Sequence, residues 1–232
     1  MNVKKIFGKL YFVPGATLNT GAGRNLRTFE RLLAARPAPL LLNVGCGSRF
    51  LGGSRLAGGD ARLVNLDILP QAPVQVVGDA QRLPFAGETF DGIVCQAVLE
   101  HLPRPWDAAG EMARVLRRGG VLYVEVPFLQ GYHPTPRDFY RFTLEGLQEL
   151  LGAYERVESG VCAGPASALS WIGREFLAGV LSGFSANRPL RRAAMFIAGW
   201  LTFPVKYLDL LLARRRNAAT IASGVYFIGL KK

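Results

Sequence analysis

A short apolar stretch that runs directly into a glycine turn constrains this chain more than any other feature. Residues 40–44 read Leu-Leu-Leu-Asn-Val and are followed by Gly45, Cys46 and Gly47, and a second apolar stretch ends at Asp67. In an open parallel sheet, the first glycine allows a sharp turn, the second lets backbone approach a ligand, and the later carboxylate binds ribose hydroxyls. The pattern predicts a nucleotide-like ligand at the end of the first strand.

Short apolar stretches alternate with helical ones from residue 40 to residue 161, which is typical of a parallel sheet with crossover helices. We therefore expect an α/β fold with a doubly wound, mostly parallel, seven-stranded Rossmann-like sheet. The expected strands are residues 40–44, 62–66, 74–77, 90–95, 120–126, 154–161 and 224–230. The expected helices are residues 26–35, 106–116 (stopped by Gly119-Gly120), 168–184 and 190–212, with another beginning after an N-cap at Thr143.

The charge pattern divides the chain into a mildly acidic centre and two basic ends. The net charge is +11, and half of the 232 residues are apolar, so a sizeable core is expected. We expect four parts: a basic segment or lid (1–36), a cofactor-binding core (37–164), a basic amphipathic helical insertion (165–216) and a last strand returning to the sheet (217–232). Basic ends are either simply solvated or meet something anionic, which is a membrane surface or an acidic polymer.

Cysteine usage and the first residues bear on the compartment. Cys46, Cys95 and Cys162 are far apart, so neither a disulfide framework nor metal-ligand spacing is visible, and we expect no metal site. Lys9 interrupts the first apolar run before it reaches the length of a secretion signal. These features favour a reducing, cytoplasmic location, with the inner face of the membrane as an alternative.

The insertion is the anomaly of the pattern, because structureless loops of this length are uncommon. In residues 168–184, large apolar side chains recur at helical spacing, with Arg174, Glu175 and Ser182 on the other side. In residues 190–212, Pro204, Lys206 and Asp209 interrupt an otherwise apolar run. A helix in the membrane interface therefore fits better than a spanning helix, and a pair of helices packed on protein remains the alternative.

Six segments along the core follow one another in a fixed order. They are LLNVGCG at 41–47, NLD at 65–67, GDAQRLPF at 78–85, FDGIV at 90–94, LEHL at 99–102 and RVLRRGG at 114–120. Together they resemble the class I S-adenosylmethionine-dependent methyltransferases, in particular the small branch often called type 11. The resemblance covers residues 38–160.

The resemblance implies a set of residues that bind S-adenosylmethionine. The glycine turn would approach the methionine part, Asp67 would accept the ribose hydroxyls, Ile68 would pack on adenine, and Asp79 would take the adenine amino group. Asn43 stands where the family more often has an acid, and Arg49 where a third glycine is usual. The full implied set is Asn43, Gly45, Cys46, Gly47, Asp67, Ile68, Asp79, Ala80, Gln96 and Ala97.

Both histidines of the chain follow predicted strands at the edge of the sheet where ligands bind. His101 follows the fourth strand and His133 follows the fifth, so each is a candidate general base. The polar and aromatic residues 131–143 around His133 resemble an acceptor-side lid of this branch. Asp138 is a third candidate catalytic residue, and Asp138 and Arg141 are either acceptor contacts or an internal ion pair.

The sequence therefore predicts transfer of a methyl group from S-adenosylmethionine to a small or lipid-linked acceptor, at a membrane surface contacted by residues 165–216. The alternative is a cofactor-binding subunit or regulator without turnover. A nucleotide-dependent dehydrogenase is disfavoured because the turn lacks the third glycine. No nucleic-acid partner is expected, and a homodimer is left open.

Overall fold

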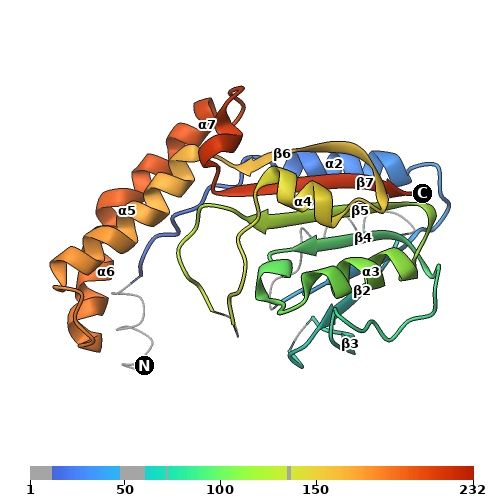
Figure 1. The fold of residues 1–232 in the computed structure, drawn as a ribbon, viewed down its shortest axis with the longest axis horizontal. Helices are drawn as coiled ribbons and strands as arrows, with labels where there is room; N and C mark the ends of the chain where they lie inside the picture. The colour runs from blue at the N-terminus through green and yellow to red at the C-terminus, as the bar shows by residue number, and fades with distance from the viewer. Residues whose placement is uncertain (1–11, 48–60, 72, 135–136) are drawn as a thin grey trace, which may run out of the picture. The chain divides into compact units, whose positions relative to one another are not determined.

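The computed structural model describes residues 12–47, 61–71, 73–134 and 137–232, which form a seven-stranded sheet with flanking helices (Figure 1). The strand order is β3-β2-β1-β4-β5-β7-β6. The strands are β1 (Leu40–Val44), β2 (Arg62–Asp67), β3 (Val76–Val77), β4 (Phe90–Gln96), β5 (Leu116–Pro127), β6 (Tyr154–Ala163) and β7 (Gly224–Lys231). All seven expected strands are present, and the α/β fold is confirmed.

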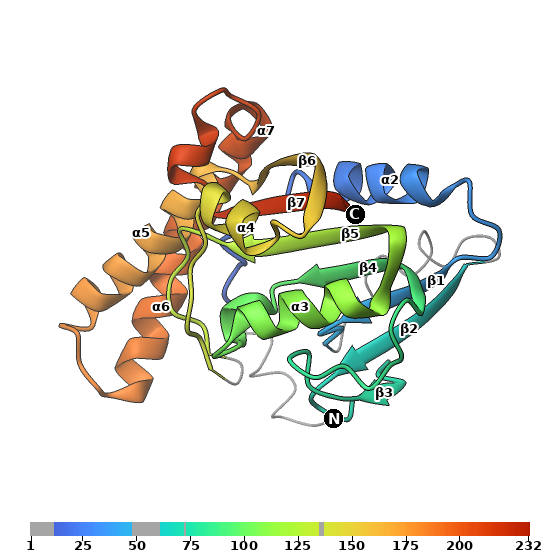
Figure 2. The same ribbon diagram turned by 45° about the vertical axis from the view of Figure 1, so that its right-hand side comes forward.

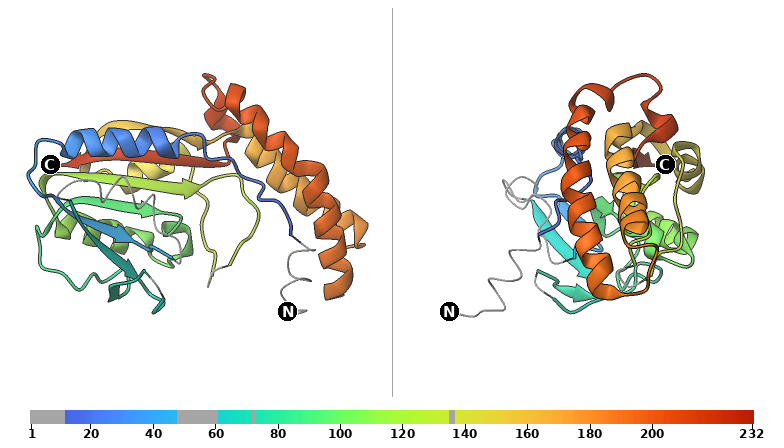
Figure 3. Two further views of the ribbon diagram at one scale, coloured as in Figure 1. Left: turned by 180° about the vertical axis from the view of Figure 1, so that it is seen from behind. Right: turned by 90° about the vertical axis from the view of Figure 1, so that its left-hand side faces the viewer.

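The sheet is parallel from β3 to β5, and β7 runs the opposite way beside β5 (Figures 1 and 3). The order reverses between β1 and β4, because β2 and β3 extend the sheet on one side of β1 and the later strands extend it on the other. In open α/β sheets, ligands bind beyond the carboxyl ends of the strands at such a reversal. Gly45 and Gly47 lie at this position.

Helices cover both faces of the sheet (Figure 2). α2 (Ala22–Leu33) lies on one face, and α3 (Pro105–Val115) and α4 (Leu144–Leu150) lie on the other. A 3-10 turn, η1 (Leu99–His101), follows β4. Thr143 caps α4 as expected, because its side chain accepts a hydrogen bond from the Gly146 N–H at 3.0 Å.

A glycine in the middle of β4 lets α2 approach the sheet. A Cβ atom on Gly92 would lie 2.7 Å from the Phe29 ring and 2.9 Å from the Leu41 side chain. Phe29 is fully buried and packs 6.4 Å, centroid to centroid, from Tyr123 of β5. Part of the core therefore depends on the absence of a side chain at Gly92.

Two expected boundaries were wrong in ways that tertiary packing explains. β5 begins at Leu116 rather than at residue 120, since the expected stop at Gly119-Gly120 is instead an irregularity where the β4–β5 register shifts. α2 begins at Ala22 rather than at residue 26, because Asn25, which lies outside the expected helix, is fully buried in α2. Packing overrides the low helix propensity of these residues.

The insertion before β7 is helical, as expected. It contains α5 (Pro165–Leu181), α6 (Arg188–Thr202), η2 (Phe203–Leu208), α7 (Asp209–Leu212) and η3 (Ala218–Ile221). α5 and α6 form a hairpin (Figure 3) that is packed on small residues, with Ala178, Ala194 and Ala198 buried between them. α6 ends at Thr202 because Pro204 has no N–H to continue the helix.

The chain divides into two compact units. Of the described residues, those within 12–20, 129–131 and 161–224 form one unit, and those within 21–47, 61–128, 132–160 and 225–232 form the other. The helices α5 to α7 belong to the first, helical unit and α2 belongs to the other, and the expected division into four parts stays a prediction. Arg49 and Lys9 lie outside the described residues, and the lid role of residues 1–36 stays a prediction.

Among the described residues, one helical run is long and apolar enough to cross a membrane by length and composition. It is Arg188–Leu212, which joins α6, η2 and α7 and has a mean hydropathy of 1.4 over its most apolar window. Length and composition alone are weak grounds for a span, because the core helix of a soluble protein can meet the same criterion.

Candidate functional site

The two glycines after β1 have different tasks. Gly45 has φ +66°, and its N–H donates to the Leu66 carbonyl at 2.8 Å; a Cβ atom there would lie 2.2 Å from Val98 Cγ2. Gly47 has φ +58°, and no residue of the described ranges occupies the space that its Cβ would take. Both positions favour glycine because L side chains rarely adopt these angles. Gly45 therefore serves close packing, whereas Gly47 leaves room for a ligand.

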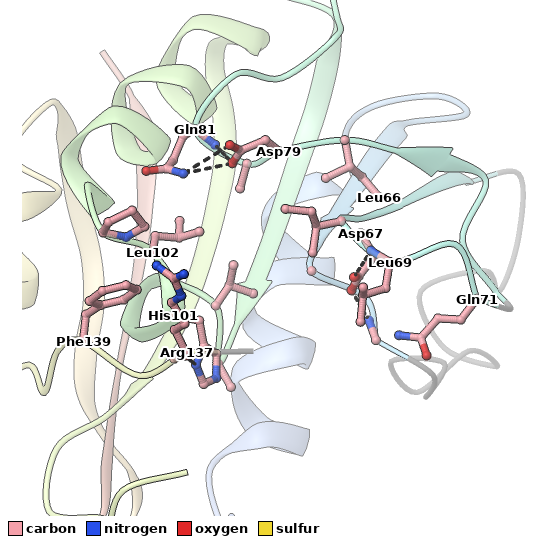
Figure 4. Close-up of a pocket in the computed structure, with 18 residues that line it drawn as sticks. Leu66, Asp67, Leu69, Gln71, Asp79, Gln81, His101, Leu102, Arg137 and Phe139 are labelled. Carbon is pink, nitrogen blue, oxygen red and sulfur yellow. Dashed lines mark hydrogen bonds between the residues drawn. The ribbon is translucent and has the colours of Figure 1, made fainter. Parts of the chain in front are cut away.

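A cavity of about 400 Å³ lies beside these glycines (Figure 4). It is bounded by the ends of β1, β2 and β4 and by the loop after β5. Eight of the predicted site residues line it: Gly45, Gly47, Asp67, Ile68, Asp79, Ala80, Ala97 and His101. The fold thus brings together residues that are up to 56 positions apart in the sequence.

Two carboxylates at the cavity are held in place by backbone donors. Asp67 accepts hydrogen bonds from the Gly47 N–H at 2.8 Å and the Leu69 N–H at 2.9 Å. Asp79 accepts from the Gln81 N–H at 2.8 Å. Ile68, beside Asp67, is 56% exposed and presents an apolar surface to the cavity. Fixed acids and an open apolar surface suit a ribose and an adenine ring, so the residues present fit the expected cofactor.

Three predicted cofactor contacts are absent from the described lining of the cavity. Asn43 is fully buried and donates to the Asn65 side chain at 2.9 Å. Gln96 donates to the Glu125 carboxylate at 2.7 Å. Cys46 is buried, and burial and the charge of Asp67 raise the pKa of its thiol. These side chains support the surrounding structure, and their role in cofactor binding stays a prediction.

The two histidines meet beside the cavity. Their rings pack edge to face with centroids 5.4 Å apart. The Nε2 atoms of His101 and His133 lie 3.8 Å and 3.9 Å from the same oxygen of Glu100. His101 lines the cavity, whereas His133 does not. Glu100 was not predicted to take part in the site, although the adjacent Glu100-His101 pair in the fourth-strand motif was visible in the sequence.

The loop after β5 is tied to the turn after β4. The backbone N–H groups of Phe139 and Tyr140 donate to the Glu100 carbonyl at 2.8 Å and 3.3 Å, and Arg137 O lies 2.5 Å from His101 Nδ1. The Arg137 and Phe139 side of the loop lines the cavity opposite Asp67 (Figure 4). Sequence reasoning predicted an acceptor-side loop here but did not identify these two residues.

Asp138 and Arg141 form an internal ion pair, one of the two expected alternatives. The Arg141 guanidinium donates to both carboxylate oxygens of Asp138, at 2.5 Å and 2.6 Å. The backbone N–H of His133 donates to one of these oxygens at 2.8 Å. These bonds, Arg141 foremost, lower the pKa of the buried Asp138 to about 2. Asp138 does not line the cavity in the described structure, so its geometry is that of a residue that positions His133.

A family model described as a methyltransferase domain matches residues 42–124. The biotin biosynthesis bifunctional protein BioHC of Cellvibrio japonicus (strain Ueda107) is 34% identical over 137 residues, which are 53% of this chain and 26% of that protein. The ubiquinone biosynthesis O-methyltransferase of Hahella chejuensis (strain KCTC 2396) is 29% identical over 134 residues, 51% of this chain and 53% of that protein. The chain thus spans about a quarter of the first relative and about half of the second.

A solved structure shares the fold. The crystal structure of Burkholderia thailandensis 1,6-didemethyltoxoflavin-N1-methyltransferase, with bound 1,6-didemethyltoxoflavin and S-adenosylhomocysteine, has a TM-score of 0.56 and 15% identity. The similarity covers 92% of this chain and 79% of that one. The matching domain model covers residues 42–124, and the glycine turn, Asp67 and Asp79 of this segment line one cavity, so this part of the chain is a methyltransferase domain whose cofactor is S-adenosylmethionine.

Proposed function

We propose that this chain transfers the methyl group of S-adenosylmethionine to a small or lipid-linked acceptor at a membrane surface. The observation that supports methyl transfer is that Gly47, Asp67, Asp79 and His101 line one and the same cavity. It combines a cradle for the cofactor with a histidine at the opposite wall (Figure 4). The location at a membrane rests on the helical unit.

The residues of the chain would hold the cofactor by its polar and apolar parts in turn. Asp67 would accept the ribose hydroxyls, Ile68 would pack on the adenine ring, and Asp79 would accept from the adenine amino group. Gly47 leaves its Cβ space open for the methionine part. When bound, the cofactor supplies a methyl group on a cationic sulfur, which is displaced in line by the acceptor.

The remaining task of the protein is to align the acceptor, exclude water and accept a proton where the acceptor is a hydroxyl or an amine. His101 is the histidine that lines the cavity, and His133 packs against it. Either ring would serve as base near neutral pH. Arg137 and Phe139 would shape the acceptor side of the cavity.

Formation of S-adenosylhomocysteine in the presence of cell-extract acceptors tests the activity. We expect product formation that falls in Asp67→Asn and His133→Ala, with Glu88→Gln as a surface control. Full turnover by His133→Ala at saturating acceptor would make the base prediction wrong. Cofactor binding by calorimetry without any product would instead support the alternative of a binding subunit without turnover.

The helical unit exposes an unusual amount of apolar surface. Leu169, Ile172, Phe176 and Val180 recur three or four residues apart along α5, and all four are exposed. Exposed apolar residues on the neighbouring helical run include Ile197, Trp200, Leu201, Leu208, Leu210 and Leu211. Exposed large apolar side chains that recur along helices in this way mark a site of protein or membrane contact.

The charges at the ends of the run Arg188–Leu212 favour a membrane with anionic lipids. Arg188, Arg191 and Arg192 are exposed at its start, and the exposed residues Arg214–Arg216 follow its end. Apolar surface flanked by arginines is the pattern of a helix that lies in the interface. The relative named as a ubiquinone biosynthesis O-methyltransferase supports a lipid-linked substrate.

A buried aspartate argues for an interfacial helix rather than a spanning one. Asp209 is 1% exposed, and its carboxylate accepts from the Ala166 and Ser167 N–H groups at 2.9 Å and 2.8 Å. It thereby caps the start of α5. To cross the bilayer separately from α5, the run would have to uncover this carboxylate in hydrocarbon, which is costly.

Flotation of the full chain with anionic vesicles tests the membrane proposal. We expect the double variant Phe176→Glu/Leu201→Glu to float at least about tenfold less, because each substitution removes an exposed apolar anchor. Trp106→Glu, at an exposed aromatic residue of α3, is the matched control. Unchanged flotation of the double variant would exclude the proposed surface, and a dimer that the double variant dissociates would favour the protein-packing alternative.

A further inference from the structure

A buried carboxylate without a partner stands at the centre of the histidine cluster. The Glu100 side chain is fully buried, and no described residue places a hydrogen-bond donor at either of its carboxylate oxygens. Burial of an unpaired charge is expensive, so buried carboxylates are normally hydrogen-bonded, ion-paired or bound to metal. We therefore expect the Glu100 carboxylate to bind a cationic or protonated partner.

Two imidazole nitrogens point at this carboxylate. One coordinating atom each from Glu100, His101 and His133 lies within 4.8 Å of the others. Two ligands bound at about 2.1 Å to a tetrahedral ion lie about 3.4 Å apart. The observed separations of 3.8 Å and 3.9 Å between Glu100 and the two Nε2 atoms need to close by about half an ångström.

The surroundings of His101 assign its proton. Nδ1 lies 2.5 Å from the Arg137 carbonyl oxygen, which only accepts, so Nδ1 carries the hydrogen. In the neutral ring, the Nε2 lone pair then faces the Glu100 carboxylate. A histidine whose Nδ1–H is held by a backbone carbonyl is the usual arrangement of a metal ligand.

His133 has the partners for the same arrangement. In the structure its Nδ1 lies 3.2 Å from Arg141 Nη2, a donor, and 3.7 Å from Asp138 Oδ2, an acceptor. With Nε2 on a metal ion, the single ring proton would move to Nδ1, which would then donate to Asp138. Asp138 and Arg141 neutralise each other, so the Glu100 carboxylate supplies the net negative charge beside the two rings.

We propose that Glu100, His101 and His133 bind a divalent transition-metal ion, with Zn²⁺ as the ion that two imidazoles and one carboxylate suit best. Such a set of three ligands leaves a fourth position open. The spacing in the sequence did not predict a metal site, because His133 joins the Glu100-His101 pair only through the loop that folds back onto the turn after β4.

The open position would bind the acceptor on the His101 side of the cavity. A hydroxyl acceptor bound there would have a lower pKa. Its oxygen would form the bond to the methyl carbon as the carbon–sulfur bond breaks, with the hydroxyl proton released to solvent. This role rests on the proposed methyl transfer, whereas metal binding itself does not.

Titration of the tag-free, chelator-treated full chain with Co²⁺ tests the site, because four-coordinate Co²⁺ has visible d–d bands that do not depend on turnover. We expect one Co²⁺ per chain, displaced by Zn²⁺, and a Kd at least about 100-fold weaker in Glu100→Gln and His133→Gln. Asp67→Asn is the matched control, expected to lose cofactor binding in calorimetry and to keep the cobalt bands.

Three results would overturn the inference. One is a wild-type chain without cobalt bands, and another is a Kd in both variants within about threefold of the wild type. The third is a thiolate-to-cobalt charge-transfer band, which would place the ion on a cysteine. If Glu100→Gln fails to fold, His133→Gln carries the test alone, because His133 is 27% exposed and tolerates a polar replacement. Calorimetry with S-adenosylhomocysteine tests cofactor binding separately, so a failure of the proposed methyl transfer is distinguishable from a failure of the metal site.

Discussion

Replacement of Asp138 by asparagine should destabilise the chain in a manner that depends on pH. The Asp138 side chain is buried and ionised. An asparagine side chain would keep its shape while removing the negative charge that Arg141 and the backbone N–H of His133 bind. The folded state therefore favours the deprotonated carboxylate over the protonated one. That preference is measured by the difference between the pKa in the folded and the unfolded chain.

The magnitude follows from the two pKa values. The pKa of Asp138 falls from its ordinary 3.8 to about 2, mainly through the hydrogen bonds of Arg141. A difference of about 1.8 pKa units corresponds to about 2.4 kcal/mol of unfolding free energy. Because the folded pKa is lowered, this contribution is complete above about pH 5, falls to about 1.3 kcal/mol at pH 3 and is nearly lost at pH 2.

Urea unfolding followed by circular dichroism at pH 7, 5 and 3 measures this effect. We expect Asp138→Asn to lose about 2 kcal/mol at pH 7 and about half as much at pH 3. The matched control is Asp107→Asn, which breaks an exposed pair with Arg104 at 3.0 Å and should cost less than about 0.5 kcal/mol. Equal losses in the two variants at pH 7, or a loss that does not shrink at pH 3, would refute the reasoning.

Four other substitutions test the site and the core. Gly45→Ala should lose about 3 kcal/mol of unfolding free energy, because its Cβ would lie 2.2 Å from Val98 and φ is +66°. Gly47→Ala, whose Cβ would meet no described residue, should lose only about 1 kcal/mol and should mainly weaken S-adenosylhomocysteine binding in calorimetry. Asp67→Asn should weaken that binding about 10- to 100-fold, since it removes a charged acceptor; unchanged affinity would exclude the ribose contact. Gly92→Ala should cost about 1–3 kcal/mol in urea unfolding because its Cβ meets Phe29 at 2.7 Å, and a neutral result would contradict the tight packing of α2.

Local patterns predicted the sheet and much of the cavity. Each buried parallel strand is a short apolar run bounded by turn residues, so the strand positions were readable from the sequence. The glycine turn, Asp67 and Asp79 lie at or just after the carboxyl ends of strands, and parallel strands bring such positions to one edge. Their arrangement around the cavity therefore followed from the element order.

Long-range contacts were beyond local patterns. Gly92 reads as an isolated glycine in a strand, and only the positions of Phe29 and Leu41 around it show why a larger residue is excluded. Asp209 reads as a charge that interrupts an apolar run, whereas in the structure it caps α5, about forty residues earlier. Both effects depend on which elements pack together, and the sequence pattern does not contain that information.

The histidine cluster supports two chemistries that exclude each other. A ring whose Nε2 lone pair binds a metal ion cannot also accept a proton at that atom, so the general base predicted from the sequence and the metal ligand inferred from the structure are rival roles for His101 and His133. The Arg137 carbonyl on His101 Nδ1 favours the ligand role, because it directs the lone pair at Glu100 rather than at solvent. If a histidine is the base, it must take up the acceptor proton, so the rate falls as the pH drops below the pKa of that histidine. If the acceptor hydroxyl is bound to the metal, the dependence of the rate on pH follows the pKa of that hydroxyl instead. Exchange of Zn²⁺ for Co²⁺ should therefore shift the pH profile only if the histidines are ligands.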